Sequence, residues 1–534
     1  MKMNNKYKVY IPLFLAIAVA LGIFLGSTLN YPKKKSVMLF NQSPQEEKIK
    51  RLIDYIQYDY VDKVNTDSLL DGTIKQILGK LDPHSVYIPA SDADGIAERM
   101  NGEFVGIGVQ FNMYKDTIAV VKVLEDGPSM KAGLKAGDRL LIADNDTLYG
   151  RNLRNDYIIK TLKGKPKTKV NLTIYRKSEN KFYTVLLKRG KVPIKSIDAH
   201  YMLNDSLGYI KVDRFAATTY KEFKKSLDIL IEKGMNHLVL DLRGNPGGYL
   251  GVATKMVDEF LEDDKLIVFT KNKGGKIDKS FASAKGDFEE GKVYVLIDEN
   301  SASASEIIAG ALQDNDKGII VGRRSFGKGL VQQEMSLGDG SAVRLTVSRY
   351  YTPTGRSIQK PYSKDGGDEY YTNDGFEGRL YSGELSSADS IKVDDSLKFV
   401  TPKGKTVYGG GGIIPDVFVG IDTTAFFGTY HVRVMNDFVF NYVDNNRKEL
   451  EEMSLPEFLE NFDKDEKILN EYLAIIKKNI KGEIDNISYI KIYLKSLFAR
   501  FLYGDNTFYM VLNQNDKMLK KVKELEYKVD YVIQ

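Results

Sequence analysis

The sequence contains no cysteine, no tryptophan and only four histidines among its 534 residues. A chain without thiols forms no disulfide, binds no metal through cysteine and has no cysteine nucleophile. It suits an oxidising compartment, where a free thiol would mispair, but the absence alone does not place the protein there. The few histidines weigh against a histidine-built metal site and against a Ser-His-Asp triad; they are His84, His200, His237 and His431.

A large excess of charge of either sign is also missing. The 77 basic and 72 acidic side chains leave a net charge of +5, so the sequence gives no reason to expect a nucleic acid as the main partner. Hydrophobic residues at 43% and charged residues at 28% are typical of a soluble globular body. A chain of this length predicts about three to four domains.

The N-terminus carries a hydrophobic run over residues 9–26, interrupted only by Pro12 and preceded by three lysines. About 18 residues is at the short end of a membrane span and longer than most signal-peptide cores. No small-residue cleavage site follows the run, and a lysine-rich flank stays in the cytoplasm. We therefore expect residues 1–30 to form a cytoplasmic stub and an uncleaved, single-pass signal anchor in a bacterial inner (cytoplasmic) membrane. The rest of the chain is then expected in the periplasm; a cleaved signal peptide is the alternative.

Hydrophobic periodicity divides the rest of the chain into regions. Apolar residues at three- and four-residue spacing predict helices from Gln45 to about Lys80, in an N-terminal region that extends to residue 100. Short alternating segments over residues 102–189 predict a small β-rich module with one helix. Its strands are expected at Val105–Phe111, Thr117–Val123, Arg139–Ile142, Val170–Tyr175 and Phe182–Leu187, and its helix at Asn152–Leu162.

Strand and helix patterns alternate over residues 190–425, which predicts an α/β core whose sheet is at least partly parallel. Residues 361–411 are rich in Gly, Ser, Asp and Lys and are expected to be an inserted loop or flap. Residues 430–534 are helical in pattern and strongly charged. The core strands are expected at Leu207–Val212, His237–Leu242, Leu266–Thr270, Lys292–Asp298 and Gly318–Gly322, and the helices at Thr219–Lys233, Leu250–Leu261 and Ser305–Gln313.

The strongest chemical signal is a turn of very small residues, Ser301–Ser305, between an apolar strand and a helix. Small residues let the backbone bend sharply and let a substrate approach a serine on the turn. The amides at the start of the helix then face developing negative charge. The alternative is purely structural, because Ser303 with Glu306 three residues later is also a good capping box.

Two further motifs flank this turn in the sequence. Lys328 lies between two glycines, which gives a flexible backbone carrying one amine, although such a lysine on its own is more often an exposed loop residue. The segment Arg243–Gly248 is a glycine-rich turn between a buried strand and a helix. Its free amides can bind a phosphate or an oxyanion, or it is a plain connection; no Lys-Ser/Thr follows, so it is not a Walker loop.

In this order and spacing, the three motifs resemble the C-terminal processing peptidase (tail-specific protease) family. The family nucleophile lies in Ser-Ala-Ser-Glu, here Ser303 to Glu306; the family lysine follows at Lys328 and its glutamine partner at Gln332. Tyr350–Gly355 and Gly412–Asp416 also look like family segments. The likeness covers about residues 45 to 420 and implies an α/β (α+β multidomain) serine peptidase core. The 361–411 insertion and the C-terminal helices depart from the pattern and bear on access to the site and on assembly.

The module at 102–189 resembles the family's PDZ domain. Phe104–Val109 is similar to the carboxylate-binding loop, which implies tail binding at Gly106, Ile107, Gly108 and Val109. Gly127–Ser129 and Ala132–Leu140 match the later PDZ pattern. Arg99 neighbours the carboxylate-binding loop in the sequence, and Arg139 lies in the later PDZ segment. The expected partners are therefore protein substrates with free C-terminal tails, while an adaptor and the oligomeric state stay open.

The resemblance implies that Ser303 attacks the peptide carbonyl, that Lys328 is the general base and that Gln332 orients its amine. The oxyanion donors are then backbone amides of Ala304 and of the Gly247–Gly248 turn. A lysine with a pKa near 10.4 is neutral only about once in 2,500 at pH 7, so burial must lower this pKa by roughly three units, about 4 kcal/mol. No step requires a metal or an organic cofactor. Glu306 either positions these groups or only caps the helix.

Two other classes of protein remain open at this point. One is a PDZ scaffold without catalytic activity, which intact Ser303, Lys328 and Gln332 weigh against. The other is a serine hydrolase whose base is a histidine, with His84 after Asp82-Pro83 folding back to the serine. The sequence does not identify the natural substrate or the residues preferred at the cut.

Overall fold

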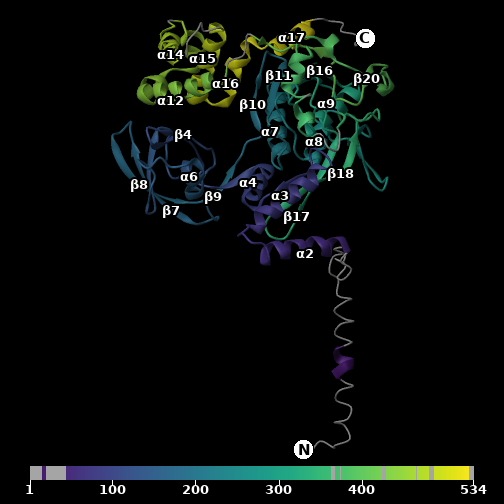
Figure 1. The fold of residues 1–534 in the computed structure, drawn as a ribbon. Helices are drawn as coiled ribbons and strands as arrows, with labels where there is room; N and C mark the ends of the chain where they lie inside the picture. Colours follow the sequence, from purple (N-terminus) through teal and green to yellow (C-terminus); the bar gives the residue numbers. More distant parts are fainter. Residues whose placement is uncertain are drawn as a thin grey trace, which may run out of the picture. The chain divides into compact units, whose positions relative to one another are not determined.

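The computed structural model describes residues 15–19, 44–362, 367–372, 374–423, 428–464, 466–479 and 486–527 (Figure 1). Within these ranges, no helix is both long and apolar enough to cross a membrane. The expected anchor at residues 9–26 lies outside the described residues, apart from residues 15–19.

The chain divides into two compact units, residues 1–73 and 74–534. In the first unit, α2 (Pro44–Tyr58) is a fifteen-residue helix, and α3 (Thr66–Gly79) runs across the boundary. Both fall within the stretch where the apolar spacing predicts helix. In the second unit, β1 (Val86–Ile88) and α4 (Ala90–Asn101) lead into the β-rich module.

The module after residue 102 is an antiparallel sheet of order β3-β4-β5-β7-β8, with β6 paired to β5. A second pair, β2 with β9, closes the module where the chain enters and leaves it. The expected single strand Val105–Phe111 is wrong, because positive-φ Gly108 breaks it into β2 and β3. The elements are β2 (Glu103–Gly106), β3 (Val109–Tyr114), β4 (Thr117–Val123), α5 (Pro128–Lys131), β5 (Asp138–Ala143), β6 (Asp146–Thr147), α6 (Asn155–Leu162), β7 (Lys169–Arg176), β8 (Lys181–Lys188) and β9 (Gly190–Pro193).

The core is a six-stranded sheet of order β10-β11-β12-β15-β16-β21, parallel except for β10. β11 and β16 are buried along their whole length, and β12 and β15 are buried at every residue but the first, as expected for a parallel sheet covered on both faces. Apolar side chains from α7, α8 and α9 cover one face and those from α17 cover the other; the four helices are labelled in Figure 1. The elements are β10 (Ile197–Met202), β11 (Leu207–Val212), α7 (Thr219–Glu232), β12 (His237–Asp241), α8 (Leu250–Asp258), β15 (Lys292–Ile297), α9 (Ala304–Asp314), β16 (Gly318–Gly322), β21 (Val417–Phe418) and α17 (Lys517–Tyr527).

A second, antiparallel sheet has the order β1-β18-β13-β14, with β17 also on β18. The strand expected at Leu266–Thr270 is therefore β13, but it lies outside the parallel core sheet. It lies between β18 and β14 in this sheet, and its last two residues, Lys271 and Asn272, are polar and exposed. An antiparallel sheet can have one solvated face, whereas the parallel core sheet is covered on both faces. The elements are β13 (Leu266–Asn272), β14 (Ile277–Phe281), β17 (Leu330–Ser336) and β18 (Ala342–Tyr351).

Residues 361–411 contain more regular structure than a loop or flap. They form α10 (Gly367–Thr372), α11 (Phe376–Tyr381), two short 3₁₀ turns and a hairpin of β19 (Lys398–Val400) and β20 (Thr406–Tyr408). Arg379 of α11 is only 2% exposed. Buried charged groups such as Arg379 and Glu384, and single buried apolar residues such as Leu385 and Val407, occur in this segment, without the apolar runs that a sequence pattern detects.

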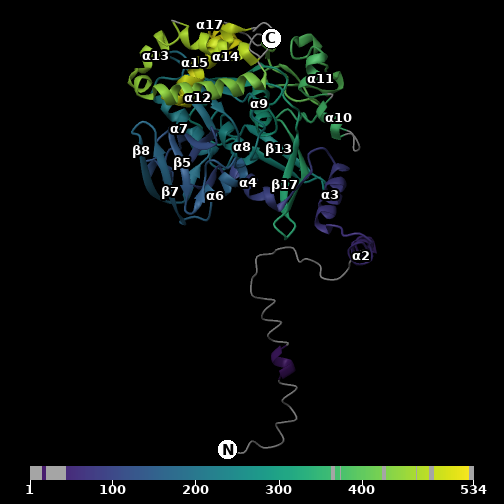
Figure 2. The ribbon, with the colours of Figure 1, turned by 60° about the vertical axis from the view of Figure 1, so that its left-hand side comes forward.

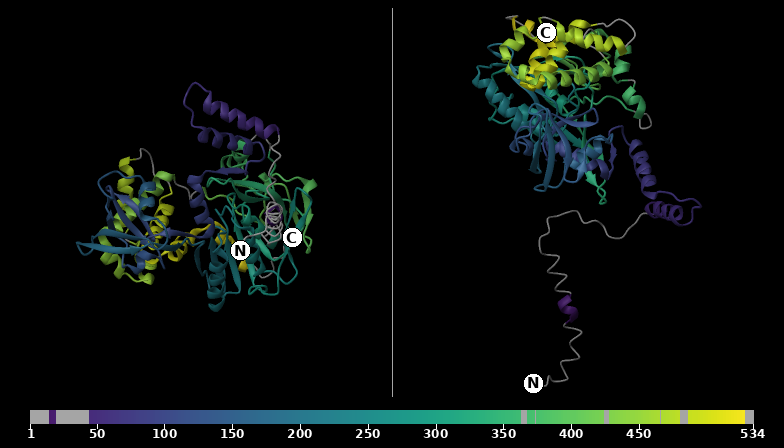
Figure 3. Two further views of the ribbon diagram at one scale, coloured as in Figure 1. Left: turned by 90° about the horizontal axis from the view of Figure 1, so that it is seen from below. Right: turned by 90° about the vertical axis from the view of Figure 1, so that its left-hand side faces the viewer.

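Beyond residue 428, the described residues are mostly helical, as the periodicity predicts (Figures 2 and 3). Apolar side chains of α12 to α16 form their own core, separate from those of the peptidase and the β-rich module. The helices are α12 (Thr429–Glu452), α13 (Leu455–Asn461), α14 (Lys467–Asn479), α15 (Ile487–Tyr503) and α16 (Asp505–Leu512).

Candidate active site

Ser303 stands at the N-cap of α9, on the turn that follows β15. Its backbone has φ 56° and ψ −110°, a region that residues with a side chain rarely adopt. Such a conformation costs about 1–3 kcal/mol and persists only where the surroundings hold it. Here the Ser303 N–H donates to the Glu306 carboxylate at 2.8 Å, and the Tyr350 hydroxyl donates to the Ser303 carbonyl at 3.2 Å.

The fully buried Glu306 carboxylate joins the serine turn to the lysine loop. Its Oε2 accepts the N–H of Ser303 at 2.8 Å and that of Lys328 at 2.9 Å. Its Oε1 accepts the Gly327 N–H at 2.7 Å and the Ser325 hydroxyl at 2.5 Å. Burial raises the pKa of the carboxyl, and these four hydrogen bonds oppose that rise. Glu306 therefore both caps α9 and holds the two candidate catalytic segments together.

The Lys328 amine points to a neutral partner. Its Nζ donates to Gln332 Oε1 at 2.7 Å. Burial lowers the pKa of Lys328, the charge of Arg344 lowers it further, and Glu306 and Asp82 act in the opposite direction. Lys328 Nζ and Ser303 Oγ are not hydrogen-bonded to each other, although both residues are described; catalytic hydrogen bonds are often long until substrate binds.

The Gly247–Gly248 turn lies directly against the serine. A Cβ on Gly247 would come within 2.8 Å of Ser303 Cβ and 3.0 Å of the Ala304 nitrogen. The Gly247 N–H is already taken, because it donates to Asn245 Oδ1 at 2.9 Å. Within the described part of the chain, the N–H groups of Gly248 and Ala304 have no acceptor. Of the three expected oxyanion donors, these two remain available.

His84 does fold back to the site, but its ring does not face the serine. Its backbone carbonyl accepts the Gln332 amide, its Nε2 lies 3.0 Å from the Tyr370 hydroxyl, and its Nδ1 lies 3.4 Å from that of Tyr371. Burial, and to a lesser extent the charge of Lys328, lowers the pKa of His84 to about 4. The ring is therefore neutral near pH 7 and its two nitrogens are occupied by tyrosines. A histidine base must hydrogen-bond the nucleophile, and His84 makes no such bond to Ser303, although the structure describes both residues, so the geometry does not support a histidine as the base.

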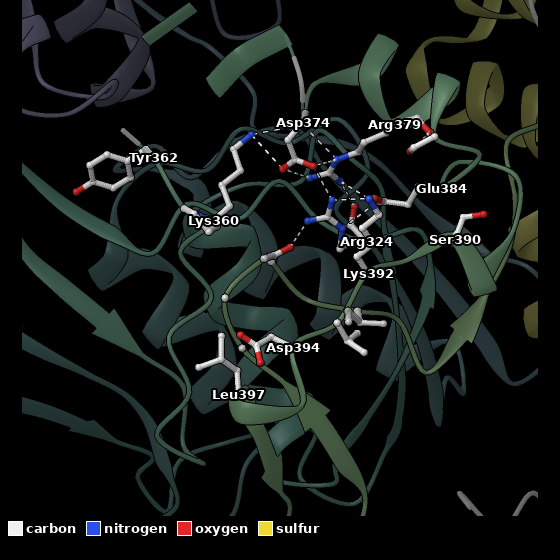
Figure 4. Close-up of a pocket in the computed structure, with 18 of the residues that line it drawn as sticks. Arg324, Lys360, Tyr362, Asp374, Arg379, Glu384, Ser390, Lys392, Asp394 and Leu397 are labelled. Carbon is white, nitrogen blue, oxygen red and sulfur yellow. Dashed lines mark hydrogen bonds and ion pairs between the residues drawn. The ribbon is translucent and has the colours of Figure 1, made fainter. Parts of the chain in front are cut away.

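The insertion holds the lysine loop from the other side. Arg379 donates to the carbonyls of Arg324 at 2.8 Å and Ser325 at 3.0 Å. Arg324 in turn pairs with Glu384 and Asp374 at 2.7 and 2.6 Å. Figure 4 shows Arg324, Arg379 and Lys360 converging on Asp374, and all four residues line a cavity of about 670 Å³. The sequence motifs did not predict this contact between Arg379 and the lysine loop, because no local pattern relates residue 379 to residue 324.

The expected tail-binding loop lines a cavity of about 1010 Å³. Gly106, Ile107, Gly108 and Val109 all border it, together with residues of α6 and with Arg99 of α4. Gly108 has φ 82°, and a Cβ there would meet the Gly127 backbone at 3.3 Å. Arg139 is not at this loop: its guanidinium is buried and bonded to Asp444.

Comparison with known proteins agrees with this architecture. The model of peptidase family S41 matches residues 206–365, and a PDZ domain model matches residues 105–187. A model of the activating protease CtpB N-terminal domain matches residues 27–92. Residues 429–504 match a family of unknown function.

Among curated relatives, the carboxy-terminal processing protease CtpB of Bacillus subtilis is 33% identical over 370 residues, which cover 67% of this chain and 76% of that protein. A probable CtpA-like serine protease of Staphylococcus haemolyticus is 31% identical, over 74% of this chain and 78% of that protein. A solved photosystem II D1 C-terminal processing protease is 27% identical over 58% of this chain and 83% of that chain, with a TM-score of 0.32. The two sequence relatives carry the assignment: the chain belongs to the carboxy-terminal processing proteases of peptidase family S41, which are PDZ-containing serine peptidases.

Proposed function

We propose that this protease cuts peptide bonds with a Ser303–Lys328 dyad. The observation that carries the proposal is the single carboxylate oxygen, Glu306 Oε2, which accepts both the Ser303 and the Lys328 N–H groups. A bond from one buried atom to each segment keeps the nucleophile and the amine in fixed relation. Gln332 accepts a hydrogen bond from the amine without adding charge, so it orients Lys328 and leaves its pKa low.

The reaction then proceeds by acyl transfer. Ser303 Oγ attacks the carbonyl carbon while neutral Lys328 takes its proton, and the lysine returns a proton to the leaving amine. Water, activated by the same base, releases the acyl group and restores the serine. The Gly248 and Ala304 N–H groups receive the oxyanion, since the Gly247 N–H is bonded to Asn245.

The proposal is tested by active-site labelling and by the products formed. A serine-directed phosphonate should label the wild-type protein at Ser303, and proteomics of cells should reveal new C-termini that disappear with Ser303→Ala. Labelling at another serine, or the same new C-termini with and without Ser303, would refute the assignment.

We also propose that the PDZ module captures the free C-terminus of the substrate. An edge strand, β3, pairs only with β4 among the described residues, so an extended peptide can add to its open side, with its carboxylate at Gly106–Val109. Amidating the terminus removes a charge-assisted hydrogen bond of about 1.5–3 kcal/mol, so binding should weaken roughly ten- to a hundredfold. Equal cleavage of free and amidated tails would rule out carboxylate capture.

Finally, we propose a single-pass anchor in the cytoplasmic membrane, with the catalytic body in the periplasm and extracytoplasmic proteins as substrates. The proposal rests on the lysine-flanked apolar run at residues 9–26. Protease added to spheroplasts should digest the protein, and alkaline carbonate should not extract it. Recovery in the soluble periplasmic fraction with a start near residues 27–30 would show cleavage instead.

A further inference from the structure

The C-terminal helical region, α12 to α16, matches a family of unknown function over most of its length. It contacts the PDZ module through charged groups. Asp444 of α12 receives both guanidinium nitrogens of Arg139, at 3.1 and 2.8 Å, and the Lys177 amine at 2.7 Å. The Asp444 side chain is 4% exposed and that of Arg139 is 10% exposed. A buried, bidentate pair of this kind fixes orientation as well as distance.

The same region is attached to the peptidase core. Asn506 of α16 accepts the backbone N–H of His200 in β10 at 2.8 Å, and the Tyr509 hydroxyl donates to Asp198 at 2.9 Å. The helices therefore contact β10 of the core sheet on one side and the PDZ module on the other. A region placed in this way can contribute to a site on the module without belonging to it.

The cavity at the tail-binding loop shows such a contribution. Besides the PDZ loop and α6, its lining includes Asn436 of α12 together with Arg500 and Phe501 of α15. Phe501 is half-buried and brings an aromatic face, while Asn436 brings an amide. The groove for an added strand is thus bordered by helices that no isolated PDZ domain possesses.

Arg500 is the charged residue that the C-terminal helices contribute to the lining of the cavity, whereas Asp92, Glu98, Arg99 and Lys163 come from the other elements. Asp505 is shared by two cations, Lys122 at 2.8 Å and Arg500 at 3.2 Å, so one carboxylate faces two positive charges. The Arg500 guanidinium is stacked 3.5 Å from the Phe508 ring centre, which fixes its plane, and its side chain is still 38% exposed. An acidic side chain of a peptide in the groove can take the uncompensated charge.

From these contacts we infer that the C-terminal helical region is the outer wall of the tail-binding groove and selects substrates upstream of their C-terminal residue. Its preferred tail is extended, with an apolar side chain against Phe501 and an acidic side chain towards Arg500. The inference rests on the proposed capture of the tail by the PDZ module. It gives the region of unknown function a role in substrate choice.

The test measures tail binding separately from chemistry, with full-length protein carrying Ser303→Ala. Fluorescent peptides carry Asp or Lys at each upstream position in turn. At one position the Asp peptide should bind more tightly than the Lys peptide, and Arg500→Glu should reverse that order. A partly exposed ion pair changes Kd by up to about fivefold, so we expect a change of about this size in each direction.

Two further variants keep the test informative if Arg500→Glu misfolds. Asn436→Glu adds a negative charge to the groove without removing the Arg500 stack, and it should weaken the Asp peptide in the same way. Arg433→Glu, on the exposed side of α12 and outside the cavity lining, is the matched control and should leave both affinities at the starting values.

Each outcome supports or refutes a role of the C-terminal helices in tail binding. If Arg500→Glu and Asn436→Glu fold and bind both peptides as the parent does, the C-terminal helices do not read the tail. If Arg433→Glu shifts the affinities equally, the effect is long-range charge and the wall is again refuted. An amidated peptide tests the terminal carboxylate alone, so failure of carboxylate capture is distinguishable from failure of the upstream wall.

Discussion

Acidification from pH 7 to pH 5 should destabilise this protease through His84. The histidine is 7% exposed, and burial lowers its pKa to about 4. In the unfolded chain the same group has a pKa of about 6.5. Below pH 6.5 the unfolded chain therefore binds a proton that the folded protein does not bind, and stability falls until the pH reaches about 4.

The size of the effect follows from the two pKa values. At pH 5 the unfolded state gains about 2 kcal/mol from protonating this one histidine, while the folded state gains almost nothing. Total stabilities are about 5–15 kcal/mol, so the loss is a substantial fraction. Because the His84 carbonyl accepts the Gln332 amide, local opening here also releases the partner of Lys328.

The assay is denaturant unfolding at pH 7, 6 and 5 on a Ser303→Ala background, which prevents self-cleavage. His84→Gln keeps a hydrogen-bonding side chain but does not titrate. Its stability should change between pH 7 and pH 5 by about 2 kcal/mol less than that of the parent. Parallel losses in the two proteins would refute the account of His84.

Three substitutions test the support of the site. Gly247→Ala should abolish activity, because the added Cβ would lie 2.8 Å from Ser303 Cβ. The control Gly251→Ala meets no atom within 4 Å and should keep wild-type turnover. Equal kcat values in the two variants would show that the Gly247–Gly248 turn does not touch the serine. Arg379→Ala should cost about 3 kcal/mol of stability and lower kcat more than it changes KM, and an unchanged Tm would mean that the insertion does not brace the lysine loop. Glu306→Gln turns an amide towards N–H donors and should lower kcat about ten- to a hundredfold, and wild-type kcat would separate the carboxylate from catalysis.

Local patterns predicted much of this fold. β4, β11 and β16 have the predicted bounds, because continuous or alternating apolar residues between turn signals define a strand by themselves. Local motifs pointed to Ser303 and Lys328 but left a structural alternative at each, and the family resemblance supplied their roles; in the structure, Glu306 links the two through one oxygen atom. Periodicity predicted only a small β-rich module at residues 102–189, and the family resemblance identified it as a PDZ domain.

What the sequence did not reveal depends on contacts between distant segments. Glycine in a turn signals space and free amides, but not that Asn245 takes the Gly247 N–H. The contact of Arg379 with the 324–326 backbone joins residues more than fifty positions apart. The pairing of Arg139 with Asp444 crosses from the PDZ module to α12, and no periodicity records it.

The most direct test of the proposed dyad is a comparison of Ser303→Ala, Lys328→Ala, the double variant and Lys328→Arg on one tail-bearing substrate. Groups that act as one unit are not additive, so the first three should lose activity to similar extents. Lys328→Arg should be equally inactive, because a guanidinium does not deprotonate in proteins. Wild-type kcat/KM should rise with pH as the buried Lys328 amine, whose pKa is lowered, becomes neutral. A Lys328→Arg enzyme that keeps even a tenth of wild-type turnover would contradict the assignment of Lys328 as the general base.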